Sequence, residues 1–212
     1  VAIFDWGVDT TNRITYVATN NREGGRMAAR KLAELIFERG KVAVIGFMPG
    51  SASTMEREEG FAEEMKKYPG VQIVQTVFGM ADRTKALAAT ENILAAHSDL
   101  SGIFADNESS SAGSVMALKA RGTTQVRFVA FDANQQLISD LQNRHIDALI
   151  VQDPFKMGYE SVKALGIKLA GGTPPAQIDS GATMVTRADL EKPDIVQLLH
   201  PDIKTLLESA GH

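Results

Sequence analysis

Short apolar runs alternate with longer amphipathic stretches along most of the chain, and this alternation constrains the fold more than any other feature of the sequence. Such runs are typical of buried strands, and the stretches between them are typical of helices that pack on a sheet. We expect strands at residues 1–4, 41–47, 71–77, 101–105, 126–131, 147–151 and 182–186. We expect helices at residues 22–39, 54–67, 83–97, 109–121, 134–143 and 155–171. The order predicts an α/β protein with a parallel sheet.

The composition limits the class of protein. The 212 residues are 44% hydrophobic and 23% charged, which is typical of a globular protein with a buried core. A formal net charge of -4 provides no broad basic surface for nucleic acid or anionic lipid. The absence of cysteine excludes disulfides and thiolate metal sites. No apolar run is long enough to span a bilayer, and the first residues lack the pattern of a signal peptide. Because Val1 already lies in an apolar run, we expect a longer natural sequence, with any export signal upstream.

Polar side chains stand where several expected strands end. They are Asp5, Asn107, Asp132 and Gln152, and Arg57 lies early in a following helix. Open parallel sheets bind ligands outside the carboxyl ends of their strands, so these are candidate ligand residues. Carboxylates, amides and a forked guanidinium suit a polyhydroxyl ligand. Each sugar hydroxyl both donates and accepts, and leaving one unpaired costs about 1 to 3 kcal/mol.

Two aromatic residues adjoin these polar positions. Trp6 follows Asp5 and Phe131 precedes Asp132, and an apolar ring can cover the C–H face of a sugar. Each feature also has a simpler explanation. A single Asp or Asn at a strand end is more often a turn residue or a helix cap, and Asp106 is expected to be only that. Phe131 taken alone is more often a core residue.

Sequence patterns that would indicate an enzyme are missing. There is no G-x-G-x-x-G, residues 46–51 lack the lysine of a phosphate-binding loop, and the region of Ser51 and Ser53 is not a nucleophile elbow. The four histidines have no metal-ligand spacing. A group of glutamates at helical spacing is expected to be a solvated helix face: Glu56, Glu58, Glu59, Glu63 and Glu64. We therefore expect no catalysis, no metal and no cofactor.

Five short motifs follow one another within residues 1–190. They are Tyr-Val-Ala-Thr-Asn-Asn at 16–21 leading to Gly24-Gly25, Glu-Arg-Glu-Glu-Gly-Phe at 56–61, Phe-Ala-Asp-Asn at 104–107, Phe-Asp at 131–132 and Val-Gln-Asp-Pro at 151–154. Each motif is common by itself. In this order and spacing, the chain resembles the ribose-binding family of periplasmic sugar-binding proteins, which has the type I periplasmic binding protein fold shared with LacI-like proteins.

The resemblance implies a set of ligand residues. Hydrogen bonds to a carbohydrate or polyol would come from Asp5, Arg57, Asn107, Asp132 and Gln152. Phe131 and Met48 would line the pocket. The family often has Arg directly after the Asp of the first crossing strand, where this chain has Trp6, so a ring replaces a donor. Trp6 is therefore a candidate ligand residue, and the sugar could be ribose, another pentose, a hexose or a sugar alcohol.

The resemblance also implies a domain organisation. A flavodoxin-like parallel-sheet lobe would be joined to a partial second lobe by three crossing strands. Residues 1–19 and 153–181 would form the partial N-terminal lobe and hinge, 20–152 and 183–190 the C-terminal lobe, and 191–212 a C-terminal tail. The family pattern begins well before Val1, so most of the first lobe is expected to be absent. We would then expect weak sugar binding, and a dimer, a swapped assembly or a separate N-terminal fragment covering the exposed surface.

The resemblance favours the solute-binding component of a carbohydrate ABC transporter, which closes on its ligand and presents it to a membrane permease from the periplasm. The alternative is the effector-binding domain of a LacI-type transcription regulator, which would require a helix-turn-helix upstream. Residues 152–159 favour the transporter. A sugar-active enzyme on a flavodoxin-like sheet is a third class, disfavoured by the missing motifs.

Overall fold

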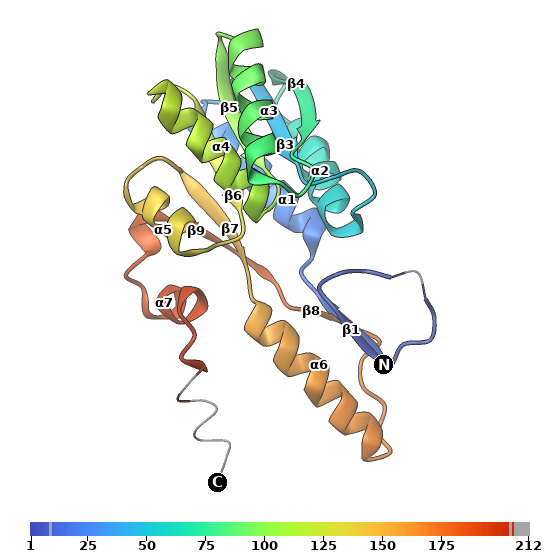
Figure 1. Ribbon diagram of the computed structural model, residues 1–212. Coiled ribbons are helices and arrows are strands. Elements are labelled where there is room, and N and C mark those ends of the chain that lie inside the picture. The colour runs from blue at the N-terminus through green and yellow to red at the C-terminus, as the bar shows by residue number, and fades with distance from the viewer. Residues whose placement is uncertain (9, 204, 206–212) are drawn as a thin grey trace.

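Two β-sheets organise the part of the chain that the computed structural model describes, residues 1–8, 10–203 and 205 (Figure 1). The larger sheet has the order β4-β3-β5-β6-β7-β9, and all neighbours are parallel except β7 and β9. Its strands are β3 (Arg39–Gly46), β4 (Gly70–Phe78), β5 (Leu100–Ala105), β6 (Arg127–Phe131), β7 (Ala148–Gln152) and β9 (Ala182–Thr186). The prediction of an α/β protein with a parallel sheet is confirmed.

The first five strands of this sheet have the order of a flavodoxin-like sheet, in which the chain starts near the middle and later reverses direction. From β3 the chain moves outward to β4, then returns to the other side of β3 to form β5. The reversal point lies between the carboxyl ends of β3 and β5, where open α/β sheets commonly bind ligands.

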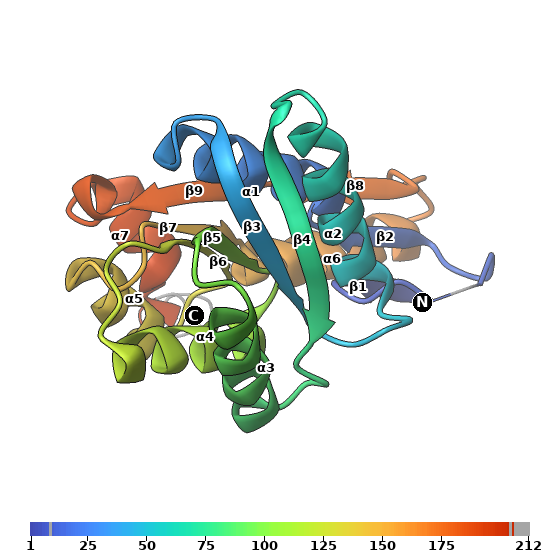
Figure 2. The same ribbon diagram turned by 90° about the horizontal axis from the view of Figure 1, so that it is seen from above.

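Helices cover both faces of the larger sheet (Figure 2). α1 (Asn21–Leu35) and α2 (Ala52–Met65) pack on one face, and α3 (Arg83–Ala96), α4 (Glu108–Arg121) and α5 (Gln135–Gln142) pack on the other. Successive side chains of a strand point to opposite faces. Val42 and Val44 of β3 accordingly pack towards α1 and α2, and Ala43 and Ile45 pack towards α3 and α4. Burial on both faces explains why these strands are continuously apolar.

Two glycines allow α1 and α2 to approach each other closely. A Cβ atom on Gly25 would lie 1.9 Å from the carbonyl oxygen of Arg57, and one on Gly60 would lie 2.0 Å from that of Arg22. Neither position can accept a side chain without moving a helix backbone. The close packing brings the first turn of α1 to the first turns of α2, beside the carboxyl end of β3.

The smaller sheet contains β1 (Ala2–Phe4), β2 (Thr15–Ala18) and β8 (Gln177–Asp179), all parallel, in the order β1-β2-β8. α6 (Pro154–Leu169) contacts β1 and β2, and Figure 1 shows these elements together at one end of the larger sheet. The chain passes between the two sheets in three places, after Ala18, after Gln152 and after Asp179. Several apolar side chains here are exposed, including Phe4, Tyr159 and Val162.

The structure corrects several expected elements. β2 and β8 were not predicted, because β2 has only four residues and β8 has three and follows a segment rich in Gly and Pro. The helix expected at 22–39 ends at Leu35, and Phe37 and Glu38 then adopt left-handed backbone angles before β3 begins. Residues 36–38 continue the mixture of apolar and charged residues found in the helix. Hydrophobic periodicity therefore did not indicate that the helix ends at Leu35.

The C-terminal tail packs on the larger sheet through α7 (Pro193–Leu199), which follows a short 3₁₀ helix, η1 (Arg187–Asp189). Ile195 is buried in the same core cluster as α3 and α4, and Leu198 and Leu199 pack against it. These residues hold the tail against the body. Residues 204 and 206–212 of the expected tail lie outside the described residues.

We predict that Phe104→Ala lowers the free energy of unfolding by about 3 to 5 kcal/mol, because it leaves a cavity in the core. The ring of Phe104 is fully buried and stacks on Phe61 with ring centroids 4.7 Å apart. Urea denaturation measures the change. Phe37→Ala is the matched control, since Phe37 is 79% exposed, and it should change the free energy by no more than about 0.5 kcal/mol. Equal effects of the two substitutions would contradict this account of the core.

Candidate functional site

A cavity of about 450 Å³ lies where the carboxyl ends of β6 and β7 face the residues that follow β1. Asp5, Asp132 and Gln152 all line it, together with Glu108 at the start of α4. Apolar residues of α6 and α7, such as Met157 and Leu198, complete the wall. Three of the five polar residues expected at the site thus share one cavity between the two sheets. We call it the sheet-end cavity.

The backbone and neighbours of Asp132 hold its carboxylate in place. Asp132 has a left-handed φ of 69°, and its amide donates to the carbonyl oxygen of Ile150 at 2.8 Å. Its Oδ1 accepts from Nε2 of Gln152 at 2.7 Å, and its Oδ2 accepts from the amide of Glu108 at 2.9 Å. Each carboxylate oxygen keeps further lone-pair capacity, so the group can still accept hydrogen bonds from a ligand.

Gln152 connects this carboxylate to the passages between the sheets. Its Oε1 accepts from the hydroxyl of Thr19 at 2.8 Å, and that hydroxyl lies 3.5 Å from the Ser180 hydroxyl. Thr19, Gln152 and Ser180 stand in the three different chain segments that run between the sheets. The sequence argument did not select Thr19 or Ser180. Their hydroxyls are common at strand ends, and only the tertiary fold brings them together.

Arg57 lies behind the cavity and is almost fully buried, with 3% of its surface exposed. Its Nε donates to Oδ1 of Asn21 at 2.8 Å, and one terminal nitrogen donates to the carbonyl oxygen of Asp106 at 2.8 Å. The same nitrogen is 4.0 Å from Oδ2 of Asp132. Burial lowers the pKa of the guanidinium, and the nearby carboxylates, Asp132 first, act in the opposite direction. Arginine remains charged in proteins, so Arg57 is a buried cation with fixed partners.

Phe131 and Asn107 lie beside this network rather than among the residues that line the sheet-end cavity. The Phe131 ring is fully buried, and the guanidinium carbon of Arg57 stands 3.8 Å from its centroid, a cation–π contact. The Asn107 side chain caps α4, because its Oδ1 accepts from the amide of Ser110 at 3.0 Å. In this arrangement both residues have the simpler roles considered above, as core residue and helix cap.

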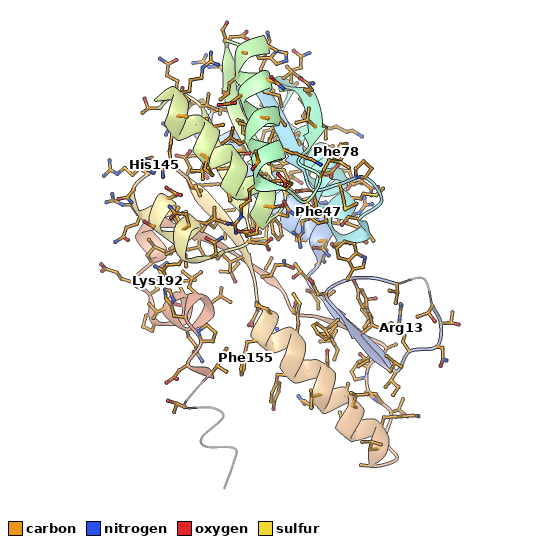
Figure 3. The ribbon with its side chains drawn as sticks, viewed as in Figure 1. Arg13, Phe47, Phe78, His145, Phe155 and Lys192 are labelled. Carbon is orange, nitrogen blue, oxygen red and sulfur yellow. The ribbon has the colours of Figure 1, made fainter. Side chains whose placement is uncertain are left out.

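Trp6 and Phe47 form a contact between the two sheets. Trp6 follows β1 and is 47% exposed, and its ring meets that of Phe47 edge to face, with centroids 6.2 Å apart. Phe47 follows β3, and Figure 3 shows it at the end of the larger sheet that faces the smaller one. Met48, an expected pocket residue, comes next and is half-buried. Phe47 was not selected from the sequence, although its place at the reversal point of the sheet could have indicated it.

The prediction that Asp106 is only a cap is wrong. Asp106 has no exposed surface, and its Oδ2 accepts from the amide of Phe47 at 3.2 Å across the ends of β3 and β5. Burial raises the pKa of its carboxyl well above the ordinary range. The residue is buried because α2 and the segment after β3 close over the end of β5.

The prediction of a solvated glutamate face on α2 is wrong for two of its members. Glu64 is buried, where its carboxylate accepts from Lys67 at 2.8 Å and lies 3.6 Å from Arg30 of α1. Glu58 is partly buried and faces Asp106. The periodicity marked one face of α2, but the contact with α1 covers part of that face.

Within residues 1–8, 10–203 and 205, no group of three or more histidine or acidic side chains is placed to hold a metal ion. In the same part of the chain, no helix is both long and apolar enough to cross a membrane. The sheet-end cavity itself combines polar side chains with a volume of small-molecule size.

A flavodoxin-like sheet and a second parallel sheet, with a cavity between them lined by polar and apolar residues, define a two-sheet protein of the α/β class. The chain belongs to the periplasmic binding protein domain family, whose sequence pattern matches residues 1–173. The resemblance noted from the five motifs is therefore confirmed at the level of the family.

The chain is similar to the ribose import binding protein of Bacillus subtilis, with 31% identity over 150 residues, which is 71% of this chain and 48% of that protein. It is also similar to a solved carbohydrate transporter solute-binding protein from Agrobacterium radiobacter in complex with D-arabinose. There the TM-score is 0.90 and the identity 30%, covering 94% of this chain and 70% of that one. A solute-binding protein from Agrobacterium vitis with bound α-D-tagatopyranose has a TM-score of 0.90 and 31% identity, covering 95% and 71%.

The chain spans about half the length of the curated relatives it matches, between 48% and 60% of those proteins. The relatives from Bacillus subtilis, Haemophilus influenzae, Actinobacillus succinogenes and Pseudomonas aeruginosa are named as binding or import binding proteins, in agreement with the expectation that the chain is not an enzyme.

We predict that Arg57→Lys lowers the free energy of unfolding by about 1 to 3 kcal/mol, because an ammonium group cannot reproduce the fork that reaches both Asn21 and the Asp106 carbonyl. Urea denaturation measures the loss. The control is Arg121→Lys at the exposed end of α4, which should have little effect. If both variants unfold like the wild type, the network around Arg57 does not stabilise the protein.

Proposed function

We propose that the chain is part of the solute-binding component of a carbohydrate ABC transporter, and that it binds a monosaccharide or sugar alcohol between its two sheets. The observation that supports this most directly is the sheet-end cavity, where Asp5, Asp132 and Gln152 meet from both sheets. The relatives named for ribose, D-apiose, D-arabinose and tagatose support the same class of ligand.

The chemistry of the cavity suits a ligand with several hydroxyl groups. Asp132 and Asp5 provide acceptors, and Gln152 provides both a donor and an acceptor. Arg57 supports Asp132 from behind, and Asn107 lies next to the wall residue Glu108. Trp6, which follows the lining residue Asp5, has a half-exposed ring that can cover the C–H face of a sugar. On this proposal Trp6 and Met48 form the apolar side of the site, and the buried ring of Phe131 supports it from behind through Arg57.

We further propose two lobes that move as units. The partial N-terminal lobe and hinge comprise residues 1–19 and 153–181, and the C-terminal lobe comprises 20–152 and 183–190, with 191–212 as a tail. The separation of β1, β2 and β8 from the larger sheet supports these boundaries. Ligand binding would close the lobes by a hinge motion, because contacts from both sides form only in the closed state.

The hydrogen bonds among Thr19, Gln152 and Ser180 place polar contacts within the proposed hinge. Closure would change the angle between the sheets while the connections bend near these residues. The closed form would then be presented to a membrane permease, with the protein in the periplasm.

The proposal also accounts for the exposed apolar side chains of the smaller sheet. β1 pairs with β2, and no second partner strand of β1 occurs in the described part of the chain. Phe4, Tyr159 and Val162 are more than half exposed on β1 and α6. We propose that further strands of the first lobe cover this side, either in the same molecule or supplied by a partner chain.

We predict that Asp132→Ala in the complete protein weakens sugar binding by about 2 kcal/mol or more, because buried hydroxyls lose their acceptor. Isothermal titration calorimetry with the sugar that binds best measures the loss. Asp99→Ala is the control. It removes a carboxylate that is 63% exposed and lies at the amino end of β5, and this variant should bind sugar like the wild type. An unchanged affinity in the Asp132 variant would remove this residue from the site.

We predict that sugar binding changes the tryptophan fluorescence of the complete protein, because Trp6 would stack on the ligand or cover it. Within these 212 residues Trp6 is the one tryptophan. Trp6→Phe serves as the control that assigns the signal. A saturating sugar that is detected by calorimetry but leaves the fluorescence unchanged would show that Trp6 only packs against Phe47.

A further inference from the structure

Two carboxyl groups face each other beneath the end of β3. Asp106 is fully buried, and Glu58 approaches it from α2. Oδ1 of Asp106 and Oε1 of Glu58 are both shielded from solvent, and neither has a hydrogen-bond donor among the described residues. The two carboxyl groups lie against neighbouring residues of one segment: Asp106 accepts from the amide of Phe47, and Glu58 lies over the backbone of Gly46. The pair is separate from the sheet-end cavity, which neither residue lines.

Facing carboxylate oxygens are stable in a buried position only if a proton lies between them. An ionised carboxylate only accepts hydrogen bonds, so two ionised groups would leave both oxygens unpaired and would repel each other. One proton converts one group into a donor for the other. The pair then satisfies both of the buried oxygens that otherwise have no partner.

The charged groups around the pair do not supply an alternative donor for these oxygens. Arg57 attracts the Asp106 carboxylate but directs its terminal nitrogen to the Asp106 backbone carbonyl. On α2, Glu59 adds a second negative charge near Glu58. Burial raises the pKa of both carboxyls, and each is raised further by a neighbouring acid, Glu58 for Asp106 and Glu59 for Glu58.

The pair contacts the segment that reaches the smaller sheet. Oδ2 of Asp106 accepts from the amide of Phe47. Oε1 of Glu58 lies only 2.7 Å from the position that a Cβ atom on Gly46 would occupy, so the carboxyl sits directly over the backbone there. Phe47 in turn meets Trp6 edge to face. An acid of α2 and an acid at the end of β5 are thereby linked to the contact between the sheets.

We propose that Glu58 and Asp106 share one proton, and that this proton holds Gly46 and Phe47 in the position that contacts Trp6. Loss of the proton separates the two carboxylates, frees the segment after β3 and weakens the contact between the sheets. The shared proton does not involve the ligand, so the test of this proposal does not depend on the proposed function.

The sign of the pH dependence follows from the raised pKa values. The folded protein retains a proton that the unfolded chain releases at about pH 4, so between that pH and the raised value the folded state binds more protons. The contribution of the pair to stability is therefore complete at low pH and is lost as pH rises through this window. Glu23 and Glu63 have lowered pKa values and act in the opposite sense at lower pH.

Carbon NMR of the side-chain carboxyl groups in the wild-type chain tests the shared proton without any substitution. We expect the signals of Glu58 and Asp106 to titrate together above the range of the exposed carboxyls, with one proton retained by the pair after the others have ionised. Assignment comes from Glu58→Gln and Asp106→Asn. If both signals titrate in the ordinary range, the pair does not share a proton and the proposal fails.

Trp6 fluorescence tests the link to the contact between the sheets. As pH rises, we expect the wild-type emission maximum to move to longer wavelength when Phe47 is released. In Glu58→Gln the transition should be absent, because the amide donates a hydrogen bond that does not titrate. Glu91→Gln, which removes an exposed carboxylate from α3, is the control and should keep the wild-type transition.

A transition that persists unchanged in Glu58→Gln, or an emission maximum that does not move while the NMR signals titrate, would show that the pair does not position Phe47 against Trp6. If Glu58→Gln does not fold, Asp106→Asn provides the same comparison, because its amide can also donate without titrating.

Discussion

The buried guanidinium of Arg57 is the interaction on which the arrangement of the site depends. A buried cation is costly unless its partners are fixed, and here they come from three different places. Asn21 begins α1, the Asp106 carbonyl follows β5, and Phe131 and Asp132 end β6. Because one rigid, planar group contacts all of them, α1, α2 and the ends of two strands are held in one relative position.

From this cation a chain of hydrogen bonds leads to the connections between the sheets. Asp132 faces Arg57 on one side and accepts from Gln152 on the other, and Gln152 in turn accepts from Thr19. Asp5, which lines the same cavity from the opposite side, also has a left-handed backbone, with a φ of 60°. The larger sheet therefore presents a hydrogen-bonded set of polar groups, and the smaller sheet is joined to it by three chain connections. Such an arrangement suits a protein that binds a small ligand by changing the angle between two parts.

Sequence reasoning predicted three of the polar residues that line the sheet-end cavity and missed other buried contacts around it, for identifiable reasons. Asp5, Asp132 and Gln152 were found because the carboxyl ends of parallel strands meet at one edge, so residues far apart in the chain must converge there. Phe47, Thr19 and the pair of Glu58 with Asp106 were missed. Their importance comes from neighbours on other elements, which no local pattern reports. β2 and β8 were missed because strands this short are defined by the partners they pair with.

The sequence by itself determined the class of fold, the main strands and helices of the larger sheet, and the family, because hydrophobic periodicity and strand-end chemistry are local properties of the chain. The tertiary structure alone decided which polar groups are buried and what they contact. Asp106 and Glu64 are ordinary acidic residues in the sequence, and they became buried, paired groups only when α2 packed against α1 and over the end of β5. Whether a polar side chain is buried, and which group it contacts, depends on the distant segment that packs over it. Only the packing of the elements in three dimensions decides this.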